Sequence, residues 1–143
     1  MSFYTDWFLA DQSEAEAIAS IATDETHSHD DWPHLAMKDV GEMELMRLWV
    51  VLRDGERLVA ASKVVFMPYE GGGPVVTRLD ADFVAALAGL EKPDVDRVAT
   101  AWHATPEMAR WEVATVASRL CEMAEFARRA RREGKPILQL HVW

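Results

Sequence analysis

The densest group of side chains capable of chemistry lies between residues 27 and 34, in the segment His-Ser-His-Asp-Asp-Trp-Pro-His. Three of the five histidines in the chain, His27, His29 and His34, stand here beside two aspartates. Imidazole and carboxylate groups are ligands that zinc and similar divalent metals take in proteins. The spacing therefore gives one hypothesis, a metal-dependent hydrolase that uses these three histidines as ligands.

A second hypothesis treats the same segment as a polar loop. Catalytic metal sites usually draw their ligands from rigid elements and orient them by further hydrogen bonds. Residues 24–39 are instead polar, are interrupted by Pro33 and are predicted to be mostly loop. Because the cluster by itself does not specify a metal, the sequence predicts no required cofactor and leaves a divalent metal as the alternative.

Trp32, in the same segment, is a candidate for binding a protein partner. Its position next to Pro33 in a predicted loop indicates an exposed indole, and an exposed tryptophan is a good anchor for a partner. The other five tryptophans are expected to point inward from the periodicity around them: Trp7, Trp49, Trp102, Trp111 and Trp143.

A basic cluster near the C-terminus is the second candidate binding site, made of Arg128, Arg129, Arg131 and Arg132. It could bind an anion or an acidic partner. Alternatively, these arginines complement the negative end of a helix dipole while their stems cover apolar surface. Residues 1–46 have the opposite sign, with 11 acidic residues and one base. The asymmetry predicts a charge-complementary contact, within the chain or between two subunits of a homodimer.

Three weaker candidates have structural explanations. His103, near a helix end, could be an acid–base group, but capping the carbonyls of its own helix explains it as well. Cys121, in the middle of a predicted helix, is expected to be a core or boundary residue. The three glycines at 71–73 do not form a phosphate loop, because a strand follows them where a helix N-terminus is needed.

Composition limits the classes of partner and compartment. The formal charge of −9 disfavours nucleic-acid binding, since such a surface repels phosphate backbones. No stretch approaches 18 consecutive apolar residues, so no membrane span is expected. A single cysteine and an N-terminus without a basic start and apolar run favour a cytoplasmic location.

The elements that would position these residues form an α+β pattern over one domain, residues 1–143. Periodicity and punctuation predict strands at 3–9, 64–66, 75–79 and 137–143, and helices at 13–23, 42–52, 80–90, 93–102 and 105–133. The segment Leu58–Lys63 is left open between strand and helix. Ser13 with Glu16, Asp80, and Thr105 are the predicted helix caps, and Gly134 the predicted end of the last helix.

These elements predict a small sheet in which the N- and C-terminal strands pair, with a hairpin beside them and about five helices packed against it. The last helix is the longest, and its inward stripe consists of Val113, Val116, Leu120, Met123, Ala127 and Ala130. The final strand is expected to be central, because both of its faces are largely apolar.

Residues 75–90, 99–108 and 125–143 together resemble a group of small uncharacterised bacterial proteins, and more loosely the YfbM-like proteins of unknown function. The similarity lies in the step from strand through Leu-Asp to helix, in the Ala-Arg-rich helix end and in the Gly that leads into a final strand. Such motifs are caps and core positions, so the resemblance implies a fold and no activity.

The sequence therefore favours a non-enzymatic interaction or adaptor-type domain of bacterial origin, with a protein partner or self-association as its mode of action. Two alternatives remain open. One is the metal-dependent hydrolase described above, and the other is a small-ligand-binding domain with a pocket between the long helix and the sheet.

Overall fold

The computed structural model describes residues 4–142 except residues 25, 56 and 71. In this part of the chain one antiparallel sheet is formed, with the strand order β2-β1-β5-β4-β3. The strands are β1 (Tyr4–Leu9), β2 (His34–Lys38), β3 (Ser62–Phe66), β4 (Val75–Leu79) and β5 (Ile137–Val142). The α+β fold predicted from the sequence is confirmed.

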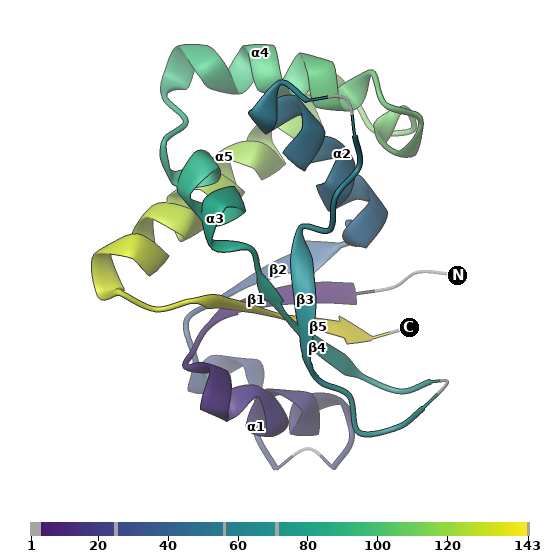
Figure 1. Ribbon diagram of the computed structural model, residues 1–143, viewed down its shortest axis with the longest axis vertical. Coiled ribbons are helices and arrows are strands. Elements are labelled where there is room, and N and C mark those ends of the chain that lie inside the picture. The colour runs from purple at the N-terminus through teal and green to yellow at the C-terminus, as the bar shows by residue number, and fades with distance from the viewer. Residues whose placement is uncertain (1–3, 25, 56, 71, 143) are drawn as a thin grey trace.

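The helices cover the two faces of the sheet unequally (Figure 1). One face carries α2 (Glu42–Arg53), α3 (Ala81–Ala88), α4 (Lys92–His103) and α5 (Val113–Glu133). The other face carries α1 (Ala15–Ala19), which is extended by single 3-10 turns on both sides, and the segment that leads into β2. Within the described residues, no helix has both the length and the apolarity needed to span a membrane.

The first and last strands pair with each other in the middle of the sheet, as predicted. β1 and β5 run antiparallel from Tyr4 opposite Val142 to Leu9 opposite Ile137. Ile137 belongs to the core under α2–α5, whereas Leu138 and Leu140 belong to the core under α1. Because side chains of a strand alternate between faces, β5 contributes to both cores at once, and its predicted central position is confirmed.

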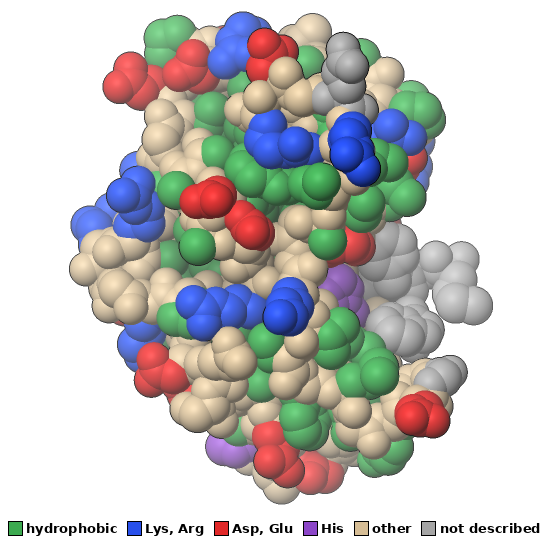
Figure 2. Space-filling model, viewed as in Figure 1, with side chains coloured by type: hydrophobic (Ala, Val, Ile, Leu, Met, Phe, Trp, Pro, Cys, Tyr) green, Lys and Arg blue, Asp and Glu red, His purple; other side chains and the backbone are tan. Residues whose placement is uncertain are grey.

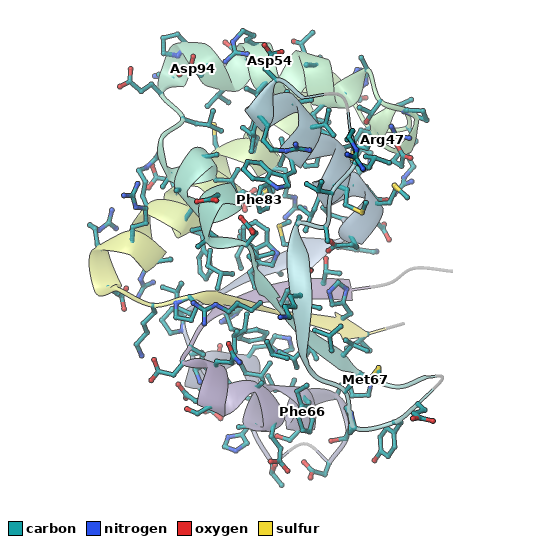
Figure 3. All side chains as sticks on the ribbon, viewed as in Figure 1. Arg47, Asp54, Phe66, Met67, Phe83 and Asp94 are labelled. Carbon is teal, nitrogen blue, oxygen red and sulfur yellow. The ribbon has the colours of Figure 1, made fainter. Side chains whose placement is uncertain are left out.

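The larger core lies between the sheet and the four helices. The predicted inward residues of α4, Val95, Val98, Ala99 and Trp102, are all buried. Phe83 of α3 points into this layer and meets Trp49 of α2 edge-on, with ring centroids 5.5 Å apart (Figure 3). The α5 stripe is buried from Val116 to Ala130. Val113, predicted to belong to it, is 47% exposed, so that assignment is wrong.

α5 begins at Val113 and not at Thr105. Pro106–Met108 form a separate 3-10 turn, and the Thr105 hydroxyl donates back to the carbonyl of Trp102 at 2.6 Å instead of capping a new helix. The 21-residue helix is therefore about 30 Å long at 1.5 Å per residue, not about 40 Å. Its end is as predicted, with Gly134 in the left-handed region at φ 66°.

Other predicted boundaries fail near the N-terminus. Residues 34–38 form β2 inside the predicted loop, where they pair with β1. Leu35 and Met37 alternate with the exposed His34, Ala36 and Lys38, so the segment carries a short strand pattern that the prediction missed. The first helical turn, Gln12–Glu14, begins one residue before Ser13, and its N-cap is Asp11 instead of the predicted Ser13. The Glu14 carboxylate accepts the Asp11 N–H at 3.0 Å. In the open segment Leu58–Lys63, β3 begins at Ser62, and the residues before it form neither helix nor strand.

The hairpin and the helix between β4 and α4 follow the prediction closely. β3 and β4 pair antiparallel, as predicted for a hairpin, with a register shift between Val64 and Phe66. Asp80 caps α3, since its carboxylate accepts the N–H groups of Asp82 and Phe83 at 2.8 and 3.1 Å.

We expect Leu120→Ala to lower the free energy of unfolding by about 2–5 kcal/mol, because Leu120 is fully buried in the larger core and its truncation leaves a cavity. Urea denaturation measures the change. Val113→Ala, on the same helix but exposed, serves as the control and should cost less than about 0.5 kcal/mol. A cost below about 1 kcal/mol for Leu120→Ala would contradict the packing of α5 on the sheet.

Candidate functional site

The three histidines proposed as metal ligands have three different partners. His29 Nε2 lies 2.6 Å from Asp6 Oδ2, and His27 Nδ1 lies 3.2 Å from Asp31 Oδ2. His34 Nδ1 lies 3.1 Å from the Trp32 carbonyl oxygen. The rings of His29 and His34 approach each other, with centroids 5.7 Å apart. Across the described part of the chain, however, no three His, Cys, Asp or Glu side chains are grouped so as to hold a metal ion.

The expected exposure of Trp32 is wrong. Its side chain is buried beneath the sheet, in edge-to-face contact with Phe8 at 5.8 Å between ring centroids. Its indole N–H donates to Glu14 Oε2 at 2.8 Å, and this bond is the main reason that the pKa of Glu14 is lowered. Glu14 stands 18 residues away, so no local pattern indicated this partner. The tryptophan holds α1 and the histidine segment together, and no exposed anchor remains at this position.

The arginine cluster is divided by the structure. Arg128 donates to the Leu90 carbonyl at 3.0 Å and to Glu125 at 2.7 Å, which lowers the pKa of Glu125. Arg129 donates to Glu133 at 2.6 Å. These two arginines therefore form their ion pairs within α5. Arg131 and Arg132 are exposed at the end of the helix, and Arg131 lines a surface cavity.

The two remaining predicted residues have separate surroundings. His103 Nε2 lies 2.7 Å from the carbonyl oxygen of Trp111, so the ring bridges the turn between α4 and α5. Cys121 is exposed, contrary to the prediction of a core or boundary position, because it lies outside the buried stripe of α5. Trp111 is half-buried, and Trp143 lies outside the described residues.

The most distinctive surface feature is a group of exposed apolar side chains around β3. Seven large hydrophobic side chains are exposed in the described residues, and five of them fall between residues 58 and 69. They are Leu58, Val59, Val64, Met67 and Tyr69, with exposed fractions from 39% to 58%. We call them the β3 edge residues. Figure 2 shows hydrophobic side chains on this face of the molecule, where β3 is the strand nearest the viewer (Figure 1).

β3 is a terminal strand of the sheet, so its outer side has no strand partner. Its beginning is covered, because the Glu42 carboxylate of α2 accepts the N–H groups of Ala61 and Ser62 at 2.9 and 3.3 Å. Beyond that point the edge from Lys63 to Phe66 has Val64, 52% exposed, at its middle. At the end of the strand, Phe66 turns towards α1 and is half-buried there (Figure 3).

The opposite edge of the sheet is treated differently. Arg119 of α5 donates to the Ala36 carbonyl of β2 at 2.9 Å, and β2 carries His34 and Lys38 as exposed side chains. An edge covered by a helix side chain and flanked by charge is a poor site for another strand. The sheet thus has one protected edge and one apolar edge.

A cavity of about 310 Å³ lies beside the apolar edge. Its lining includes Glu42, Ser62, Thr77 and His141. His141 comes from β5 and is hydrogen-bonded to side chains of β4 and β5. Gln139 Nε2 lies 2.8 Å from His141 Nε2, and Thr77 Oγ1 lies 3.2 Å from the same nitrogen.

The hydrogen bonds of this group fix the protonation state of His141. The Trp7 indole can only donate, and its Nε1 lies 2.6 Å from Gln139 Oε1. The amide nitrogen of Gln139 is then the donor towards His141, so His141 Nε2 accepts and the ring is neutral. Burial acts in the same direction, because it lowers the pKa of His141 to about 4.

Comparisons with protein-family models, curated proteins and solved structures give no match to this chain. The resemblance to small bacterial proteins stays a prediction, and the function has to be argued from the structure alone.

We expect zinc or manganese to raise the melting temperature by less than about 2 °C, because a ligand stabilises a protein only as far as the native state binds it. The three histidines are directed to separate partners instead of to one ion. Thermal denaturation of untagged protein with increasing metal measures this. A saturable rise of several degrees, absent from the double variant His29→Ala, His34→Ala, would contradict the expectation.

The neutral His141 predicts acid sensitivity. The folded pKa of about 4 lies below the unfolded value of 6.5, so the unfolded state takes up more protons between these values. Stability that is present above pH 6.5 is therefore lost as the pH falls towards 4, by about 3 kcal/mol for this residue. The measurement is the free energy of unfolding of the wild type minus that of His141→Gln, from pH 8 to 4. A difference that stays constant within about 0.5 kcal/mol would show that His141 is not buried as described.

Proposed function

We propose that this chain is a non-enzymatic protein-interaction domain that binds an extended, acidic segment of a partner protein along the β3 edge. The observation that supports this most directly is the concentration of exposed apolar side chains around a strand with a free outer side. Exposed apolar side chains gathered in one region of a protein surface often mark a site of interaction with a partner.

The edge favours an extended partner. A strand added to a sheet edge forms main-chain hydrogen bonds with it, and alternate side chains enter the pockets beside it. At β3, Val64 offers an apolar contact on the strand, and the cavity lined by Ser62 and Thr77 lies next to it. This cavity would accept one side chain of a bound strand, while Met67 and Tyr69 extend the apolar contact along the hairpin.

The local charge favours an acidic partner. Residues 57–69 contain the two bases Arg57 and Lys63 and no acidic residue, within a chain whose net charge is −9. Self-association through β3 is electrostatically disfavoured, because antiparallel pairing of two β3 strands brings two Lys63 side chains to one short interface. The nearby Glu42 carboxylate is already bonded to Ala61 and Ser62 of its own chain. A partner segment that alternates apolar and acidic residues could pair with β3, contact its apolar side chains and be attracted by Arg57 and Lys63.

The test uses model peptides. We expect a fluorescent peptide that alternates Glu and Val to bind the wild type at low salt at least about 10-fold more tightly than one that alternates Lys and Val. Lys63→Glu should weaken the acidic peptide about 10-fold and strengthen the basic one, because it reverses the charge at the edge. Fluorescence anisotropy measures both affinities.

Two controls make the result specific. Lys92→Glu reverses one charge at the exposed start of α4, far from the edge, and should leave the peptide affinities unchanged. An acidic peptide that is N-methylated at alternate residues should bind weakly, because it cannot complete the strand hydrogen bonds. Equal binding of the two unmodified peptides, or full binding of the methylated one, would overturn the proposal. If the wild type is a dimer and Val64→Glu dissociates it, the β3 edge binds a second copy of this chain and not an acidic partner.

A further inference from the structure

A second cavity, of about 450 Å³, lies on the other side of the helical layer, where the end of α5 leads into β5. α3 and the end of β4 complete its walls. Three bases line it from three different elements: Arg78 of β4, Arg131 of α5 and Lys135 of the connection to β5. We call it the basic groove.

The charge of the groove is unusual for this chain. The sequence has 24 acidic and 15 basic residues, yet the groove lining contains three bases and no acid. Among the described residues, no carboxylate lies within 4 Å of Arg78, Arg131 or Lys135 in an ion pair. Arg78 donates only to the neutral amide of Gln12, at 3.1 Å. Figure 2 shows Lys and Arg side chains in a band across this face.

The backbone carbonyl and N–H groups around the groove already have hydrogen-bond partners of their own. At the end of α5, the carbonyls of Ala130 and Arg131 already accept the N–H groups of Lys135 and Gly134, at 3.0 and 3.2 Å. At the start of α3, Asp80 occupies the first N–H groups. The positive charge that faces the groove therefore comes from the side chains of Arg131 and Lys135, of which Lys135 also helps to lower the pKa of Glu14.

The rest of the lining is apolar. Leu79, Val84 and Ile137 form part of the wall, together with Ala130. Leu79 and Ile137 are 2% and 0% exposed, so they belong to the larger core behind the wall, and the exposed apolar surface of the groove comes from Ala81 and Ala85 of α3. Sites for small ligands usually combine such an apolar wall with a few charged groups that fix the orientation of the ligand.

We propose that the basic groove binds a small organic anion, a phosphate or carboxylate group joined to a compact apolar body. The Arg131 guanidinium and the Lys135 ammonium receive the anionic group, for which arginine offers paired N–H donors. The apolar body lies against Ala81 and Ala85 of α3, the exposed apolar side chains of the lining. This inference does not depend on the proposed peptide site, because Arg131 and Lys135 lie outside the β3 edge.

The test is isothermal titration with phenyl phosphate, benzoate and inorganic phosphate at low salt. We expect saturable binding of at least one aromatic anion, tighter than that of inorganic phosphate, because the apolar wall contributes only to the former. The tighter of phenyl phosphate and benzoate identifies the anionic group. In the double variant Arg131→Gln, Lys135→Gln this binding should weaken at least about 10-fold, because two charge-assisted contacts are lost.

A matched variant separates a site from general charge. The double variant Arg97→Gln, Arg129→Gln also removes two positive charges, but from exposed positions outside the groove, and it should retain wild-type affinity. Both substituted residues of the test variant are exposed, so it should fold, which circular dichroism verifies. The proposal is overturned if neither aromatic anion saturates the protein, if inorganic phosphate binds as tightly as both, or if the two double variants lose affinity equally.

Discussion

The pairing of β1 with β5 is the contact on which the rest of the structure depends. It joins the two ends of the described chain in the centre of the sheet, and a buried hydrogen bond from Trp7 to Gln139 crosses it. Closing so long a loop is entropically costly, and the cost is offset only because both strands bury side chains on both faces. Because β1 and β5 pair in the centre, the intervening segments supply the outer strands, β2 on one side and β4 and β3 on the other, and the helices on both faces.

This arrangement distributes the layers and the edges unequally. Four helices on one face build the larger core, whereas α1 and Trp32 cover the other face with a smaller one. At the edges, Arg119 covers part of β2, while Glu42 covers only the first residues of β3. The chain thus places five of the seven large apolar side chains that are exposed in the described residues around the edge that a helix covers only at its start.

The two proposed binding surfaces use different chemistry and different parts of the fold. The β3 edge combines backbone, apolar side chains and Lys63, which suits an extended partner. The basic groove combines side chains from α5, β4 and the final connection around an apolar wall, which suits a small anion. Arg78 lies between them, since it also borders the cavity that contains Lys63. The chain as a whole is acidic, with a net charge of −9, whereas both proposed binding surfaces are locally basic.

The sequence by itself determined the parts of the structure whose signals are local. The α4 stripe, the Asp80 cap, the Gly134 helix end and the β3–β4 hairpin each depend on residues a few positions apart, so periodicity and capping chemistry were enough to predict them. Only the tertiary structure decided the contacts between distant segments. β2 pairs with β1 from about 30 residues away, and Trp32 is buried against Phe8 and bonded to Glu14. The candidate sites follow the same rule. The histidines close in sequence were directed to separate partners, whereas the three bases of the groove, 57 residues apart at the extremes, were brought to one cavity. The physical reason is that sequence spacing fixes which residues share a face of one element, while packing between elements fixes which faces meet.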